Sequence, residues 1–317
     1  MSELIPAFDW QRVMIDPWTI DFSLYGWIAL MGFLVATACG LVGNYLILRR
    51  MALMGDAVSH SVLPGLVIAF LLTSSRGTLP MFLGALAAGI TATVLIEAIH
   101  RKTRVKQDAA MGIAFSTMFA IGVLLVSLYS EHVDLDADCV LYGEIAFIPL
   151  EPMVTWLGVT LGPVSLVRMG VVLLVVVGLI LVFYKELLIA SFDEALARAT
   201  GVNPTWVHYA LMSVLSVVIV SAFESVGAIL VIAMLILPGA TASLMTDRLA
   251  VMHGIAVVHA ALSAWLGIVL GVWLDCSIGA AMVVGGAGIF TLVWIGSLVA
   301  RWHRESRGGW GDDRGPA

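Results

Sequence analysis

Long runs of apolar residues dominate the chain, and each is close to the length needed to cross a bilayer. They lie at about 24–48, 52–73, 79–98, 109–129, 169–184, 207–223, 226–244, 254–273 and 278–299. A transmembrane helix needs about 20 predominantly apolar residues. The pattern therefore predicts an all-α fold, a polytopic transmembrane helix bundle with eight or nine spans.

Two stretches do not fit this simple pattern. The stretch 211–242 is too long for one untilted span and has Glu224 and Gly227 near its middle. We expect it to cross twice, which gives nine spans, or eight if one run does not fully cross. The stretch 152–165 is apolar but short, which is typical of a re-entrant or interfacial segment.

Lysine and arginine indicate the orientation of these spans. With nine spans and an external N-terminus, the cytoplasmic connections hold 13 of the 16 basic residues, and the external ones hold only Arg12, Arg76 and Arg168. An excess of basic residues marks the cytoplasmic side. The distribution favours nine spans, because a single span over 211–242 would place the basic C-terminus outside.

The chain is expected to form one membrane domain. We divide it into an extracytoplasmic N-terminal lead-in over 1–22, a transmembrane domain over 23–300 and a cytoplasmic polar tail over 301–317. The lead-in lacks the basic start and small-residue cleavage site of a signal peptide. The 317 residues leave no room for a large soluble domain beside the spans.

Composition excludes several functions. Hydrophobic residues make up 61% of the chain and charged residues 12%, far from the balance of a soluble domain. There is no Gly-Lys-Ser/Thr phosphate loop, so any ATP hydrolysis requires another chain. Cys39, Cys139 and Cys276 have no CxxC spacing, which gives no support for a zinc knuckle, and pairing of Cys139 with Cys276 is left open. We expect no nucleic-acid partner and no enzymatic activity.

Asp56 and His60 lie inside the second run, four residues apart. That spacing places both side chains on one face of a helix. A carboxylate and an imidazole there can bind a divalent metal, with Ser59 and Ser61 orienting the ligands. Alternatively, Asp56 and His60 pair only with each other, or reach toward the basic end of the span.

Glu224 is the second carboxylate that stands out within the apolar runs. An ionisable residue in the membrane is costly and is a functional hypothesis by default. Its candidate partners are His60, a bound cation or a buried serine. The alternative is a protonated side chain bonded to the backbone.

Two connections carry further hypotheses. The external connection 130–151 is acidic, as expected of either a solvated loop or a docking or cation-gathering surface. The cytoplasmic connection 190–204 predicts a short helix, capped by Ser191, with Asp193 and Glu194 in its first turn and Gly201 at its end. It has too little positive charge for lipid binding and suits a groove on a soluble partner.

Together these segments resemble the permease family of ABC transporters for manganese, zinc and iron. The resemblance covers about 24–300. Its most specific part is Arg49-Arg50-Met51 followed by Gly55-Asp56-Ala57-Val58-Ser59-His60-Ser61-Val62-Leu63-Pro64-Gly65. Other matching pieces are Asp108 to Ile113, Leu141-Tyr142-Gly143, and Ala233 to Ala242.

The resemblance implies an importer-type permease in the bacterial inner membrane. Its partners would be a cytoplasmic ABC ATPase dimer, a second permease subunit in a homo- or heterodimer, an extracytoplasmic metal-binding protein and membrane lipid. The transported manganese, zinc or iron would be a substrate, and no cofactor would be bound permanently.

The segment from Phe192 is similar to the coupling helix of such permeases. The ATPase-coupling residues implied are Phe192, Asp193, Glu194, Ala195, Arg198 and Gly201. The segment departs from the general importer pattern, because Leu196 replaces an alanine and the gap from Glu194 to Gly201 is one residue longer.

Two other classes of function were weighed. A stand-alone proton-coupled secondary metal transporter would use Asp56 and Glu224 to carry protons. It predicts internal repeats, and we find no convincing one. An intramembrane metalloprotease requires a His-Glu-x-x-His helix, which is absent.

Overall fold

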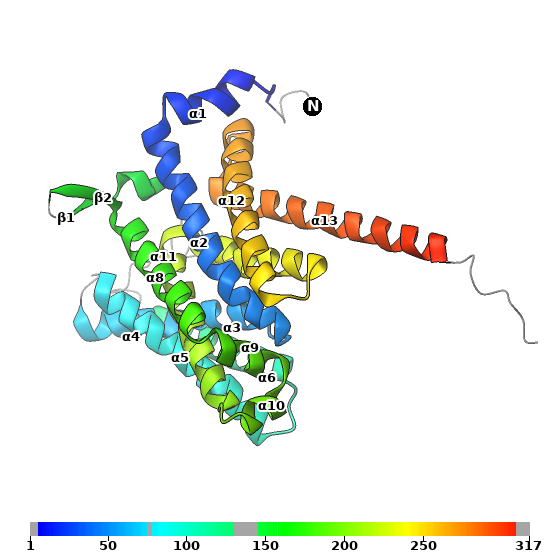
Figure 1. Ribbon diagram of the computed structural model, residues 1–317. Coiled ribbons are helices and arrows are strands. Elements are labelled where there is room, and N and C mark those ends of the chain that lie inside the picture. Colours follow the sequence, from blue (N-terminus) through cyan, green and yellow to red (C-terminus); the bar gives the residue numbers. More distant parts are fainter. Residues whose placement is uncertain (1–5, 75–77, 130–144, 157, 309–317) are drawn as a thin grey trace, which may run out of the picture.

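A computed structural model describes residues 6–74, 78–129, 145–156 and 158–308 (Figure 1). Over these residues the chain is a helix bundle with one small hairpin. Its α-helices are α1 (Asp16–Thr19), α2 (Phe22–Leu48), α3 (Met54–His60), α4 (Leu63–Thr73), α5 (Thr78–Lys102), α6 (Gln107–Leu128), α8 (Val164–Val182), α9 (Tyr184–Phe192), α10 (Glu194–Ala199), α11 (Pro204–Met245), α12 (Leu249–Leu274) and α13 (Ile278–Gly308).

Eight segments of the described chain are long and apolar enough to cross a membrane. They include Met54–Thr73, which comprises α3 and α4, and Pro204–Phe223, the first part of α11. A shorter apolar helix covers Leu230–Met245. The predicted all-α bundle of eight or nine spans is confirmed, and the chain is a multi-pass membrane protein.

Helix α11 is interrupted where the sequence led us to expect a division. As one straight helix its 42 residues would be about 63 Å long, twice the hydrocarbon thickness of about 30 Å. Gly227 has φ 75° and ψ 165°, a conformation open essentially to glycine alone. The break separates the span from Leu230–Met245, and a ninth crossing by that shorter helix stays a prediction.

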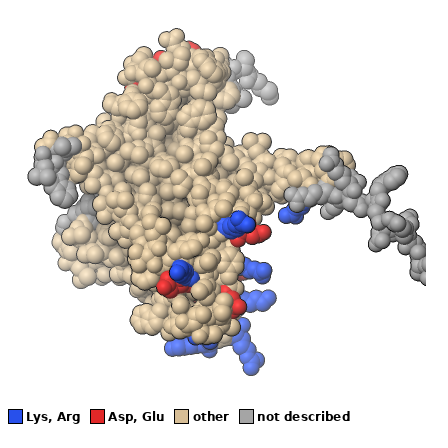
Figure 2. Space-filling view, viewed as in Figure 1, with Lys and Arg blue, Asp and Glu red and all other residues tan. Residues whose placement is uncertain are grey.

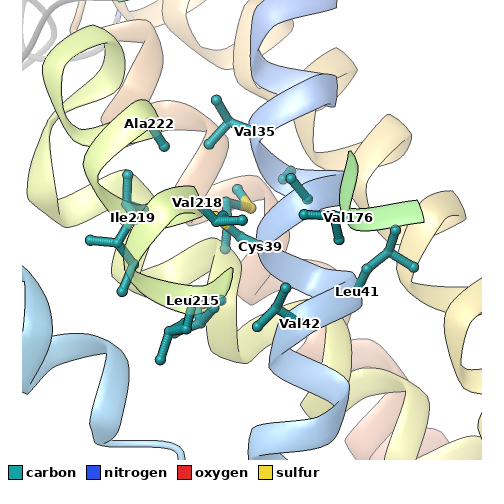
Figure 3. Packing of buried hydrophobic residues seen from close by; sticks show 14 of the residues in the cluster. Val35, Cys39, Leu41, Val42, Val176, Leu215, Val218, Ile219 and Ala222 are labelled. Carbon is teal, nitrogen blue, oxygen red and sulfur yellow. The ribbon is translucent and has the colours of Figure 1, made fainter. Parts of the chain in front are cut away.

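Helix α2 lies at the centre of the core (Figure 3). Its Val35 and Cys39 are fully buried and lie beside Val218 and Ala222 of α11. On its other side, Val176 of α8 packs into the same cluster. Close van der Waals packing of this kind holds membrane helices together, because lipid tails offer no hydrophobic driving force. The core thus fixes the part of the bundle from which α3 and the cytoplasmic segments extend.

The short apolar stretch before α8 is a β-hairpin, not a re-entrant segment. Strands β1 (Met153–Trp156) and β2 (Val159–Pro163) pair antiparallel after the 3-10 helix η2 (Ile145–Leu150). The Glu151 carboxylate accepts hydrogen bonds from the backbone N–H and the hydroxyl of Ser165, at 2.9 and 2.7 Å. It thereby caps the start of α8.

The charged side chains are distributed as the orientation predicts. On the face shown in Figure 2, Lys and Arg gather toward the end of the bundle that holds α10, and the opposite end shows only acidic atoms. The π-helix η1 (Gln11–Ile15) and α1 lie at that opposite end (Figure 1). Helix α13 continues to Gly308, so the predicted polar tail begins as helix. The domain boundaries themselves stay a prediction.

Candidate metal pathway and coupling segment

Asp56 and His60 lie one turn apart on the same face of α3. Nε2 of His60 is 3.3 Å from Oδ1 of Asp56. Two ligands that bind one ion at right angles, each about 2.1 Å away, would lie about 3.0 Å apart. The pair is therefore close to the geometry in which both groups bind the same ion. The distance also fits the alternative of direct pairing, which an entering ion would replace.

The pair is only partly enclosed. The His60 and Asp56 side chains are 34% and 38% exposed, so each keeps a side open to a ligand. Phe115 and Phe119 of α6 contact the imidazole, with ring centroids 5.9 and 6.1 Å from it. In the chain as described, no three His, Cys, Asp or Glu side chains form a metal-binding group. Asp56 and His60 would thus supply two ligands to an ion bound here, and the ion would need others.

Ser59 and Ser61 use their hydroxyl protons within the helix. Ser59 donates to the backbone carbonyl of Asp56 at 2.9 Å, and Ser61 donates to that of Ala57 at 2.7 Å. Both serines are buried. They stabilise the backbone that carries the pair, and a direct orienting contact with its ligand atoms stays a prediction.

A local break between two helices lies directly before Pro64 and Gly65. Helix α3 ends at His60, and α4 begins at Leu63 with Pro64 in its first turn.

Glu224 is placed only by its backbone, about one turn before the α11 break at Gly227. Its side chain lies outside the described residues, so its contact with an ion stays a prediction.

The predicted coupling segment forms a short helix at the basic end of the bundle. Asp193 has an extended backbone and caps α10, accepting hydrogen bonds from the N–H groups of Ala195 and Leu196, each at 2.9 Å. The cap predicted at Ser191 is wrong, because α9 runs on to Phe192. Gly201 follows the helix with φ 84°, as its predicted role at the end requires.

The outer face of this segment is open. Phe192 and Leu196 are 56% and 50% exposed, whereas Ala197 is completely buried against the bundle. Glu194 and Arg198 form an exposed ion pair at 3.4 Å. The segment thus offers two large apolar side chains and a charged rim to a partner. Its contact with an ATPase stays a prediction.

A third carboxylate within the spans was missed from the sequence. Glu97 lies in the span Leu79–Lys102 and is only 5% exposed. One of its carboxylate oxygens accepts a hydrogen bond from Nε of Arg101, and the other is 3.3 Å from Nε2 of His208 in α11. The sequence offered one signal for this contact, a glutamate within an apolar run and one helical turn before Arg101. Nothing in the sequence indicated that His208 would be its partner.

Arg49, at the end of α2, reaches toward the coupling segment. Its Nε donates a hydrogen bond to the Ser191 hydroxyl at 3.2 Å. Burial lowers the pKa of this guanidinium, and the nearby Glu194 carboxylate partly opposes that effect. An arginine nevertheless stays charged at physiological pH. The contact joins α2 to α9 just before α10.

A comparison with models of known protein families identifies the family of this chain. Residues 21–297 match the model of the ABC 3 transport family. The chain belongs to the ABC 3 transport family. It is a bacterial membrane permease of an ABC transport system, as the resemblance in its sequence predicted. Family membership does not support the alternative of a stand-alone proton-coupled carrier.

Similar proteins cover most of the chain. The manganese transport system membrane protein MntD of Bacillus subtilis is 46% identical over 260 residues, 82% of this chain and 88% of that protein. The zinc transport system membrane protein TroD of Treponema pallidum is 43% identical, over 84% of this chain and 72% of its own length. The structure of PsaBC from Streptococcus pneumoniae in complex with Fab matches with a TM-score of 0.69 and 33% identity, over 85% of this chain and 90% of that one.

Two predictions from the sequence are not tested by the structure. Most of the acidic connection 130–151 lies outside the described residues, although Glu151 is seen capping α8. Cys139 lies in the same undescribed stretch, so its pairing with the exposed Cys276 stays open.

Proposed function

We propose that this chain is the permease subunit of an ATP-driven importer of divalent transition-metal ions, with manganese as its first candidate substrate. The observation that carries the proposal is the Asp56–His60 pair, in a membrane span of an ABC permease. A carboxylate suits Mn²⁺, and an imidazole is an accepted ligand for first-row metals. Manganese is also the metal in the names of MntD and of several other similar proteins.

The proposed site binds its ion transiently. Asp56 and His60 hold the ion on its way through the bundle, with Glu224 as a third candidate ligand and water filling the remaining positions. Transport requires binding weak enough for release, which favours few protein ligands. The partial exposure of the pair supports this role, because an ion can reach it without unfolding the helix.

The energy source is proposed to lie in other chains. This chain has no phosphate-binding loop, so ATP is hydrolysed by a cytoplasmic ATPase dimer that docks on Phe192 to Gly201. A second permease subunit completes the pathway, and an external metal-binding protein delivers the ion. Support comes from membership of an ABC family and from the exposed apolar side chains of the coupling segment.

Zinc is the second candidate substrate. The name of TroD specifies zinc, and that protein is nearly as similar to this chain as MntD. His60 provides the nitrogen that zinc commonly takes as a ligand. Iron stays a prediction from the sequence resemblance.

The test is uptake of radioactive manganese or zinc by cells that lack their own importers and express the chain with its ATPase and binding protein. Asp56→Ala and His60→Ala should each abolish uptake, because either leaves only one ligand of the pair. Matched controls are Asp247→Ala and His100→Ala, which remove exposed groups of the same kinds. Normal uptake by both pathway variants, at equal membrane levels, would overturn the proposal. The metal whose uptake is lost identifies the substrate.

A further inference from the structure

Glu97, Arg101 and His208 form a polar cluster at the cytoplasmic end of the bundle, which we call the α5–α11 tie; Glu97 and His208 are buried and Arg101 is half exposed. Glu97 is shared by Arg101, from its own helix, and His208, from α11. His208 is 8% exposed and Glu97 is 5% exposed. A terminal nitrogen of Arg101 also lies 3.5 Å from the Thr205 hydroxyl, at the start of α11. Two contacts therefore join the end of α5 to the first two turns of α11.

The tie lies directly behind the coupling segment. A cavity of about 480 Å³ is lined by residues of both. Glu97, Arg101 and His208 contribute to its lining from the tie, and Glu194 and Arg198 contribute from α10. Helix α10 is connected to α11 by only four residues, 200–203. A movement of α10 must therefore act on the start of α11, where the tie is anchored.

Both helices joined by the tie also contact the helix that carries the proposed metal ligands. Helix α5 packs along α4 and contacts α3, the helix that carries Asp56 and His60. Helix α11 also packs against α3. Relative movement of α5 and α11 would thus reach α3 from both sides. The tie is the polar contact between these two helices nearest to α10.

The cluster is not suited to hold the transported ion itself. The guanidinium of Arg101 already occupies one oxygen of Glu97, and a divalent cation there would face that positive charge at close range. The Glu97–His208 contact is also not a well-directed hydrogen bond, because the His208 nitrogen has no hydrogen-bond partner in the described chain despite the short distance. A small helix shift would therefore straighten or break it.

We propose that Glu97 and His208, held in place by Arg101, are positioning residues that transmit the movement of α10 to α5 and so couple ATP hydrolysis to metal transport. This inference rests on the proposed function. It assigns to the tie a role in transmission, in which neither Glu97 nor His208 contacts the ion. The single carboxylate between two helices makes the transmission specific, because losing either Glu97 or His208 removes this polar contact while the packing of α5 against α11 remains.

The test measures metal ions imported per ATP hydrolysed, in vesicles containing the complete complex. Glu97→Ala and His208→Ala should each lower this ratio about fivefold or more, within the usual range of coupling between sites. The double variant should be no worse than Glu97→Ala alone, because that change already removes the contact with His208. His208→Gln retains a hydrogen-bond donor and should recover part of the ratio. His100→Ala, which changes another residue of the same cavity, should leave it unchanged.

The outcomes separate the tie from the proposed function. A purely structural role would lower the amount of assembled complex and leave the ratio of the remaining complex unchanged, which would overturn the tie. A wild-type ratio in His208→Leu, which keeps a packed side chain but has no polar group for Glu97, would also overturn it. A wild-type complex without metal-stimulated hydrolysis would overturn the proposed function, and the tie with it.

Discussion

The protein contains two carboxylate–imidazole pairs with the same separation and different surroundings. In both, the imidazole nitrogen is 3.3 Å from a carboxylate oxygen. Asp56 and His60 belong to one helix and are about one-third exposed, whereas Glu97 and His208 belong to two helices and are buried. Arg101 adds a positive charge to the second pair only, as far as the structure describes the chain.

The difference shows that ligand chemistry alone does not make a metal site. An ion can approach Asp56 and His60 from their open side and replace their mutual attraction. At Glu97 it would have to displace a guanidinium from a buried carboxylate, which is strongly unfavourable. Exposure and the third charge thus support the proposed pathway role of the first pair and the proposed connecting role of the second.

The largest expected effect comes from placing a positive charge beside Asp56 and His60, as Arg101 does beside Glu97 and His208. Phe119→Arg would place a guanidinium beside His60, whose ring centroid is 6.1 Å from that of Phe119. The added charge should repel a divalent ion and lower metal uptake at least about tenfold. Phe119→Gln, polar but uncharged, is the control. Equal uptake by both variants at matched membrane levels would mean that charge at this pair does not control entry.

The position of both pairs relative to the membrane is a second test. The distribution of basic residues predicts that Arg104 and Arg304 are cytoplasmic and Asp136 is external. Single cysteines at these positions, in a cysteine-free background, should react with an impermeant reagent added outside only at position 136. The reverse pattern would place the coupling segment and the tie on the external side, where no ATPase can dock.

An effect of intermediate size is expected from a change in the coupling segment. Glu194→Lys reverses one charge of its exposed rim and removes the ion pair with Arg198. We expect several-fold weaker association with the ATPase, or hydrolysis no longer linked to uptake, because the rim would repel a complementary surface. Glu186→Lys on α9 is the control. Co-purification and metal-stimulated hydrolysis are measured. Unchanged values for Glu194→Lys would mean that the segment is only a connection.

The two pairs also show what the sequence can predict. Asp56 and His60 were recognised because a helix brings residues four apart together, and that geometry is fixed by the chain itself. Glu97 and His208 meet only because α5 and α11 pack side by side, and no local pattern encodes that contact. Glu97 was overlooked because Arg101 follows it at the end of an apolar run, where charges are expected.

Local structure was predicted unevenly for physical reasons. The division of 211–242 was predicted from its length, because one helix cannot span twice the bilayer thickness. The hairpin at 153–163 was missed, although its Val, Thr and Trp content favours strands, because apolar character alone does not distinguish a strand from a helix. The cap of α10 was placed at Ser191, since the extension of α9 to Phe192 depends on packing.

A smaller effect, on stability, is expected from removing the positive charge of Arg101 beside Glu97 and His208. Arg101→Gln leaves Glu97 buried without its guanidinium and should lower the free energy of unfolding by about 1–3 kcal/mol, reduced because Arg101 is half exposed. Adding Glu97→Gln should recover most of the loss, because a neutral amide is cheaper to bury. Thermal unfolding in detergent measures both. A full loss retained in the double variant would show that the guanidinium contributes by packing instead of by charge.

The smallest expected effect concerns Gly201, which ends the coupling segment. At φ 84° a β-branched side chain is strained, so Gly201→Val should cost about 1–2 kcal/mol locally. Apart from the chain neighbours of Gly201, no atom of the described residues lies within 4 Å of the position of an added side-chain carbon, so the cost comes from the backbone and not from a clash. The strain should shift the end of α10 and weaken coupling modestly, while metal binding at Asp56 and His60 is unchanged. Gly201→Asn, which tolerates this conformation, should retain coupling near the wild-type value. If valine and asparagine variants import the same number of ions per ATP, the end of α10 does not need its left-handed turn, and coupling must depend on the body of the helix and on the tie behind it.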